Sequence, residues 1–162
     1  MSETLLRIDD RLLHGQVLLG WASSWRPERV VLASDEVAQD AERSAFYTSL
    51  AEGDYDIEVV PVTTAAAALS EPRPPTRALY VVGRAADARR LVELGARIDQ
   101  INVGGMHHAP GRKRLLDYVH LSEQDARDLR ALLERGVRLE ARDLPGARGV
   151  PIDRRMLARV WP

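Results

Sequence analysis

The feature that most restricts the fold is a regular alternation of short apolar segments and amphipathic helical segments. Strand patterns occur at residues 4–8, 29–34, 56–62, 78–82, 98–105 and 137–142. Helical patterns occur at residues 15–24, 35–51, 65–70, 86–95, 122–136 and 154–161. Strands that alternate with helices at this spacing require right-handed crossovers and a mostly parallel sheet. We therefore predict an α/β fold: an open, mostly parallel twisted sheet with helices on both faces, and a candidate antiparallel strand near the C-terminus.

Polar residues predict where several helices begin. Asp35 is expected to cap the helix that follows it, and Thr63 or Thr64 to cap the next one. The segment "SEQD" at residues 122–125 is typical of a capping box. The sequence shows no internal repeat, and 162 residues is the size of one ordinary domain. Residues 1–162 are therefore expected to form a single domain.

Composition excludes several classes of protein. The formal net charge is −1, which argues against a dedicated nucleic-acid binder, because such proteins carry an excess of Lys and Arg. The sequence has neither an apolar run long enough for a membrane span nor a secretion signal at its start. It has no cysteine, so disulfides, thiolate metal sites and cysteine nucleophiles are excluded. We expect a cytoplasmic protein.

A ligand crevice is expected beyond the carboxyl ends of the strands, where open parallel sheets bind their ligands. Four loops are predicted to lie there: residues 9–14, 62–64, 82–84 and 102–105. The first leads into a helix N-terminus, where the backbone N–H groups around Gly15 and Gln16 favour an anion such as phosphate. Neither a G-x-G-x-x-G nor a G-x-x-x-x-G-K-[ST] motif is present, so a phosphate would be held in another way.

The first loop also contains residues suited to covalent phosphoryl transfer. A neutral imidazole at His14 has one nitrogen lone pair and can carry a phosphoryl group. Arg11 offers a planar set of donors to phosphoryl oxygens, and Asp9 or Asp10 could orient Arg11 or the imidazole. A structural interpretation stands beside this one, because a single histidine in a turn is more often structural. Asp10 would then be a turn or capping residue.

Three segments of the sequence resemble one bacterial family. The segment "RIDDRLLHGQV" at residues 7–17 resembles the active-site segment of IIB components of the mannose–fructose–sorbose family of the sugar phosphotransferase system. The segments "INVGGMHHAPGRKRL" (101–115) and "LSEQDARDLRALLERGVRLEARDLP" (121–145) are similar to two further parts of those proteins. The resemblance extends over nearly the whole chain.

The resemblance implies an activity and a set of partners. It implies a protein-N(π)-phosphohistidine–sugar phosphotransferase in which Nδ1 of His14 accepts a phosphoryl group from a phosphohistidine on a IIA protein. The group then passes to a sugar of the mannose, fructose or sorbose type carried by membrane IIC and IID components. Arg11 is the arginine expected to steady the phosphoryl group. The protein would be cytoplasmic and peripherally associated with the membrane transporter.

The remaining site residues follow from the same reading. Asp10, Gly15 and Gln16 are expected to contribute to phosphate binding, and Leu12 and Leu13 to an apolar docking surface around the loop. No cofactor and no metal are expected, since the adjacent side chains of the "MHH" segment (106–108) diverge and no further ligand set follows them.

Two other functions stay open at this stage. A IIB-type chain could act as a regulatory phosphoprotein of an incomplete system, signalling rather than transporting sugar. It could also be a small-molecule or nucleotide-binding α/β protein with an incidental histidine. The sequence leaves open which sugar is used and whether the chain forms a homo-oligomer. It also leaves open whether Thr63, Arg84 and Gly104 line the site.

Overall fold

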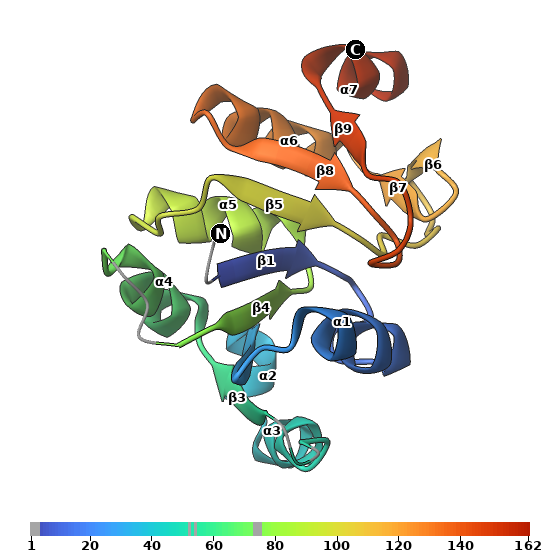
Figure 1. Cartoon of the computed structure of the whole chain (residues 1–162). Helices are drawn as coiled ribbons and strands as arrows, with labels where there is room; N and C mark the ends of the chain where they lie inside the picture. Colours follow the sequence, from blue (N-terminus) through green and yellow to red (C-terminus); the bar gives the residue numbers. More distant parts are fainter. Residues whose placement is uncertain (1–3, 52, 54, 73–75) are drawn as a thin grey trace.

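A computed structural model describes residues 4–51, 53, 55–72 and 76–162. Its main sheet has seven strands in the order β3-β2-β4-β1-β5-β8-β9 (Figure 1). The strands are β1 (Thr4–Ile8), β2 (Arg29–Ala33), β3 (Asp56–Val60), β4 (Ala78–Val82), β5 (Gln100–Val103), β8 (Arg138–Ala141) and β9 (Val150–Ile152). Neighbouring strands are parallel except β8 and β9, which are antiparallel. The predicted fold class is confirmed, including the antiparallel strand near the C-terminus.

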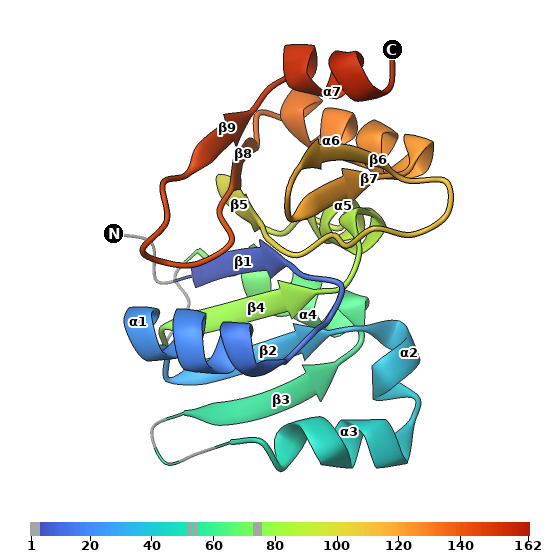
Figure 2. The ribbon, with the colours of Figure 1, turned by 90° about the vertical axis from the view of Figure 1, so that its right-hand side faces the viewer.

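Helices cover both faces of the sheet, as expected. They are η1 (Gln16–Ala22), α1 (Ser23–Trp25), α2 (Asp35–Ala38), α3 (Ala41–Thr48), α4 (Val62–Ser70), α5 (Ala85–Glu93), α6 (Glu123–Glu134) and α7 (Arg154–Val160). Helices α4, α5 and α6 lie on one face and α1 lies on the other (Figures 1 and 2). In the described part of the chain, no helix combines the length and the apolar character that crossing a membrane requires.

The core divides into two apolar clusters because side chains alternate across each strand. Leu6 and Ile8 of β1 belong to the cluster under α4, α5 and α6. The other cluster lies under η1 and contains Val17 and Trp21. Arg7 lies between Leu6 and Ile8 in β1. It is fully buried, and its guanidinium packs against the ring of Trp21. A buried guanidinium requires polar partners, and these partners adjoin the candidate functional site.

Several predicted boundaries of helices and strands are wrong. The helix expected at residues 35–51 is two helices, because Asp40 caps a new one by accepting a hydrogen bond from the Arg43 N–H at 3.1 Å. Ser34, rather than Asp35, caps α2. The predicted strand 56–62 ends at Val60, since Pro61 is followed at once by α4.

The threonine caps predicted for α4 are also wrong. Thr63 and Thr64 lie inside the helix, and its N-cap is Pro61. The carboxylate of Asp35 accepts the hydrogen bond from the first helical N–H, that of Val62, at 2.8 Å. By contrast, the predicted capping box at the start of α6 is confirmed, with reciprocal hydrogen bonds between Ser122 and Asp125.

Two local features were absent from the sequence interpretation. The segment 15–24 contains the π-helix η1 before the short α1, so its turns are wider than those of an α-helix. Strands β6 (Lys113–Leu116) and β7 (Val119–Leu121) form a separate antiparallel hairpin. This hairpin lies beside the carboxyl end of β5 (Figures 1 and 2), next to the loop that follows β1.

Candidate functional site

Three of the four predicted loops meet at the carboxyl edge of the sheet. The N–H of Asp9 donates to the carbonyl of Val82 at 2.9 Å, and that of Asp10 donates to Gly105 at 2.7 Å. These bonds join the loop after β1 to those after β4 and β5, which flank β1. The fourth loop, 62–64, follows edge strand β3, and β2 and β4 separate it from β1. Its predicted place in the crevice is wrong.

His14 lies in this loop with one ring nitrogen engaged by a carboxylate. Its Nε2 is 3.0 Å from Oδ2 of Asp9. Because an ionised carboxylate only accepts hydrogen bonds, this contact assigns the proton to Nε2 and leaves the lone pair on Nδ1. Nδ1 accepts a long hydrogen bond, 3.3 Å, from the backbone N–H of Gln16. The side chain is 19% exposed, so the ring is oriented by the protein and still reachable from outside.

Asp9 is fully buried and connects His14 to the interior. Its Oδ2 also accepts a hydrogen bond from the Arg7 guanidinium at 3.1 Å, and its Oδ1 accepts one from the Arg11 N–H at 3.1 Å. A carboxylate removed from water is stable only when such donors satisfy it. Of the two acids that the sequence offered as orienting groups, the structure places Asp9 on the imidazole.

Arg7 is the residue at this site that the sequence interpretation missed. Its guanidinium donates to Oδ1 of Asn102 and to the carbonyls of Arg142 at 2.8 Å and Asp143 at 3.2 Å. Burial lowers the pKa of the Arg7 guanidinium, although the neighbouring Asp9 carboxylate opposes this shift. The sequence did contain a sign of this role, because Arg7 is a charged residue in the middle of a strand that is expected to be buried on both faces.

Gly104 makes room for this guanidinium. A Cβ at residue 104 would overlap the guanidinium of Arg7. Gly104 therefore adjoins the site indirectly: it lies against Arg7, and Arg7 is paired with Asp9. The glycine provides a close approach between β5 and the polar network rather than turn geometry alone.

Arg11 lies on the open side of the loop. Its guanidinium is 41% exposed, donates to Oε1 of Gln16 at 2.5 Å, and has its Nε 3.8 Å from Asp9. Gly15 is the N-cap residue of η1 and Gln16 is its first residue, so both adjoin the His14 ring. The structure thus brings together Arg11, His14, Gly15 and Gln16, the residues predicted to surround a phosphoryl group.

Asp10 points to a different set of partners. Its carboxylate accepts hydrogen bonds from the backbone N–H of His107 at 2.7 Å, from the ring Nδ1 of His107 at 2.5 Å and from Arg112 at 3.1 Å. Burial raises the pKa of the Asp10 carboxyl, but the hydrogen bonds from His107 and Arg112 outweigh it and hold the pKa below its ordinary value. Asp10 therefore fixes the loop that follows β5 against the loop that follows β1.

The remaining candidates lie away from His14. Arg84 is paired with Asp87 at 2.9 Å and lines a polar depression with Asp10 on the other side of the loop. The side chains of His107 and His108 diverge, toward Asp10 and toward His120 respectively. Among the residues that the structure describes, no group of three His, Cys, Asp or Glu side chains is arranged to hold a metal ion.

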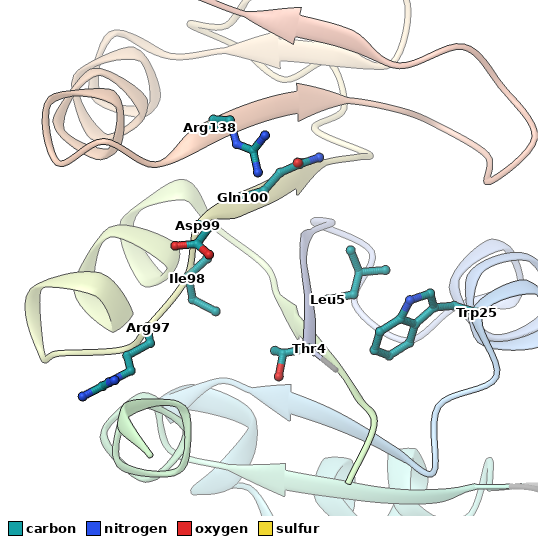
Figure 3. Close-up of a pocket in the computed structure, with 8 residues that line it drawn as sticks. All are labelled: Thr4, Leu5, Trp25, Arg97, Ile98, Asp99, Gln100 and Arg138. Carbon is teal, nitrogen blue, oxygen red and sulfur yellow. The ribbon is translucent and has the colours of Figure 1, made fainter. Parts of the chain in front are cut away.

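Two cavities lie at opposite edges of the sheet. The larger, about 610 Å³, lies at the amino ends of β1, β5 and β8 and is lined by Thr4, Trp25, Gln100 and Arg138 among others (Figure 3). A smaller groove of about 330 Å³ lies between η1 and α3 and reaches the carboxyl edge at His14. The smaller one adjoins the loop after β1 and the start of η1, which is where open parallel sheets bind their ligands.

Comparisons with known proteins identify the family of this chain. Residues 3–159 match the family described as the PTS system sorbose subfamily IIB component. The chain is 35% identical to the fructose-specific EIIB component of Bacillus subtilis, over 90% of each chain. It is 35% identical to the mannose-specific EIIAB component of Escherichia coli K12, over 85% of this chain and 43% of that one.

A solved structure gives the same result. The crystal structure of the IIBSor domain of the sorbose permease from Klebsiella pneumoniae superimposes with a TM-score of 0.82, at 32% identity and over 93% of each chain. Sequence and fold thus agree over nearly the full length. The chain belongs to the sorbose subfamily of the IIB components of the phosphotransferase system.

Proposed function

We propose that this protein is a phosphocarrier that accepts a phosphoryl group on Nδ1 of His14 from a phosphohistidine of a IIA-type donor. It then transfers the group to a sugar held by membrane IIC and IID components. The observation that supports this most directly is the contact between Asp9 and Nε2 of His14, which leaves the lone pair on Nδ1 of a partly exposed ring. The family to which the chain belongs supports the class of reaction.

The first transfer step follows from this arrangement. The bond between phosphorus and the donor nitrogen breaks as the bond to Nδ1 of His14 forms, and the donor nitrogen keeps the electron pair. With the proton retained on Nε2, the phosphorylated ring of His14 carries a positive charge. Asp9, 3.0 Å away, stabilises that charge.

The second step uses the same charge. A positively charged ring is a good leaving group, so a sugar hydroxyl oxygen can bond to phosphorus while the electron pair of the N–P bond returns to Nδ1. The hydroxyl proton leaves to water, and the ring returns to the neutral form that the structure describes. The step needs alignment and charge stabilisation more than covalent chemistry from the protein.

Other residues of the loop neutralise the phosphoryl oxygens in this proposal. Arg11 supplies its exposed guanidinium, and the N–H groups of Gly15 and Gln16 supply donors at the start of η1. For Asp10 we replace the predicted direct contact with phosphate by a positioning role, because a carboxylate repels phosphate and its partners are His107 and Arg112. The whole chain acts as one domain on the cytoplasmic side of the transporter.

The deciding experiment maps the phosphorylated residue. The protein is incubated with phosphoenolpyruvate, the general carrier proteins and the cognate IIA protein, and the acid-labile phosphate is located by mass spectrometry. We expect label on His14, and none in His14→Ala. His108→Ala, which removes an exposed imidazole outside the site, is the control and should be labelled like the wild type. Label at another residue, or in His14→Ala, would overturn the proposal.

A further inference from the structure

Trp21 of η1 adjoins the polar network that supports His14. The guanidinium carbon Cζ of Arg7 lies over its ring, 4.9 Å from the ring centroid. The indole Nε1 donates a hydrogen bond to the carbonyl of Asp143 at 3.0 Å, and the same carbonyl accepts one from Arg7 at 3.2 Å. This shared acceptor fixes the ring and the guanidinium relative to each other.

Hydrogen bonds alone do not satisfy the buried guanidinium of Arg7. Within the part of the chain that the structure describes, its buried Nε has no hydrogen-bond partner. The negative face of an indole attracts a cation, and the attraction is strongest where water is excluded. Arg7 is fully buried and Trp21 is 7% exposed, so this contact is nearly dry. The ring therefore compensates part of the buried charge that the hydrogen bonds leave uncompensated.

Arg7 and His14 both contact the same oxygen atom of Asp9. Oδ2 of Asp9 accepts a hydrogen bond from Arg7 at 3.1 Å and lies 3.0 Å from Nε2 of His14. Because Asp9 is fully buried, water does not take the place of either contact. A shift of the guanidinium therefore moves the oxygen that holds the ring proton of His14.

We propose that Trp21 is a positioning residue for phosphoryl transfer. It holds Arg7 against Asp9, and Asp9 in turn keeps the proton of His14 on Nε2. The inference rests on the proposed function, in which Nδ1 of His14 attacks phosphorus. Without the indole ring, Arg7 and Asp9 are held less firmly. More of the imidazole rings then carry their proton on Nδ1, where it occupies the lone pair that the reaction needs.

The alternative is that Trp21 only fills space in the core. It belongs to the apolar cluster under η1, together with Val17. That role depends on volume rather than on aromatic character, so another apolar side chain that filled the space would replace it. The proposed role depends on the ring face over Arg7 and changes the proton position on His14, which a loss of core volume alone would not do.

The test compares variants at two tryptophans that each lie against an arginine. Trp21→Phe keeps a ring face for Arg7 but loses the hydrogen bond to Asp143, and Trp21→Leu loses both. Trp25→Leu is the matched control. Arg77 lies over the Trp25 ring at 4.5 Å, and Trp25 lines the cavity at the amino ends of the strands. Circular dichroism and thermal midpoints verify that each variant folds.

The first measurement needs no phosphoryl donor. Nitrogen NMR of the neutral His14 ring gives the ratio of rings protonated on Nε2 to rings protonated on Nδ1. We expect this ratio to fall at least about threefold in Trp21→Leu, less in Trp21→Phe, and not in Trp25→Leu. A wild-type ratio in Trp21→Leu would overturn the inference. So would an equal fall in Trp21→Phe, since the ring face would then not matter, or in Trp25→Leu.

The second measurement is the rate at which His14 is labelled by two donors. One is the cognate IIA protein, phosphorylated as above; the other is phosphoramidate, a small molecule that acts without a protein surface. Both rates should fall by the same factor, at least about tenfold in Trp21→Leu and less in Trp21→Phe. A loosened Asp9 also stabilises the charge of the phosphorylated ring less well. Trp25→Leu should match the wild type. A fall with the IIA protein alone would mean that Trp21 serves docking, and would overturn the inference.

The inference and the proposed function can fail separately. If the wild type is not labelled on His14 by either donor, the proposed function fails, and the role of Trp21 in transfer fails with it. If His14 is labelled but neither the proton ratio nor the rates depend on Trp21, only the inference fails.

A second way of weakening the ring face avoids any loss of folding in Trp21→Leu. Fluorinated tryptophan, incorporated biosynthetically, has a weaker negative ring face at nearly the same size. The chain has three tryptophans, so the same incorporation into Trp21→Phe shows what the other two contribute. Fluorination should lower the proton ratio and both rates in the wild type but not in Trp21→Phe. No change in the wild type would overturn the inference.

Discussion

The guanidinium of Arg7 occupies the space next to Gly104 in which any larger residue would place its Cβ. Arg7 is buried and hydrogen-bonded on several sides, so it has little freedom to move away. Gly104→Ala should therefore lower the free energy of unfolding by about 1–3 kcal/mol, as overpacking does. It should also slow the labelling of His14, because a displaced Arg7 no longer holds Asp9.

Urea unfolding and the rate of phosphorylation by phosphoramidate measure these two effects. Gly146→Ala is the matched control, because a Cβ at residue 146 meets nothing within 4 Å. The interpretation is wrong if Gly104→Ala is as stable and as quickly labelled as Gly146→Ala.

Asp9 sets the proton position on His14, which leads to a second prediction. In Asp9→Asn the amide can donate a hydrogen bond to Nε2, which moves the ring proton to Nδ1 and removes the lone pair that attacks phosphorus in the proposed reaction. We expect labelling of His14 to slow by at least about 10²-fold with either donor. The variant also leaves Arg7 buried without its carboxylate, which should cost about 3–5 kcal/mol of stability.

Nitrogen NMR of the His14 ring distinguishes the tautomer change from a general loss of structure. Asp128→Asn is the control, because Asp128 is also a buried carboxylate paired with an arginine, Arg89, but it lies on α6. A variant that keeps the proton on Nε2 and yet loses activity would show that Asp9 acts in another way.

The sequence could predict which residues surround His14 because these residues are close together in the chain. Arg11, His14, Gly15 and Gln16 lie within six positions, and the structure brings them to one place. The strand and helix patterns likewise predicted the parallel sheet, since alternation of side chains along each strand is a local property.

The supporting network could not be predicted in the same way. Arg7 contacts Asn102 across 95 positions, and Asp10 contacts His107 across 97. Such pairs are defined only once β1 and β5 lie side by side, which local patterns do not specify. The capping of α4 by Asp35 was missed for the same reason, because that side chain comes from another element. The helix break before α3 has a local cause, the competing cap at Asp40, which the sequence interpretation overlooked.

Arg11 is the residue from which we expect an effect on transfer without an effect on the fold. Its side chain is 41% exposed, and its polar contacts are with the neighbouring residues Gln16 and Asp9. Arg11→Ala should slow labelling of His14 about 10- to 100-fold with either donor, since one charged donor to the phosphoryl oxygens is lost. Arg11→Lys should recover part of the rate, because it restores charge but not the planar pair of donors.

The thermal midpoint of Arg11→Ala should match the wild type. Arg127→Ala, which removes an exposed arginine from α6, is the control for the loss of one positive charge. Equal labelling rates for Arg11→Ala and Arg127→Ala would remove Arg11 from the mechanism.

Asp10 gives a prediction about pH. Because hydrogen bonds from His107 and Arg112 hold the pKa of Asp10 below its ordinary value in the folded chain, its stabilising effect is complete above the unfolded-state pKa of about 3.9. That effect is lost as the pH falls through the lower, folded-state pKa.

Asp10→Asn should lower the free energy of unfolding by about 1–3 kcal/mol at pH 7, and this difference should shrink below about pH 4. Urea unfolding at several pH values measures it, with Asp117→Asn, an exposed carboxyl, as the control. A difference that stays constant down to pH 3 would show that Asp10 stabilises the loop by its shape and not by its charge.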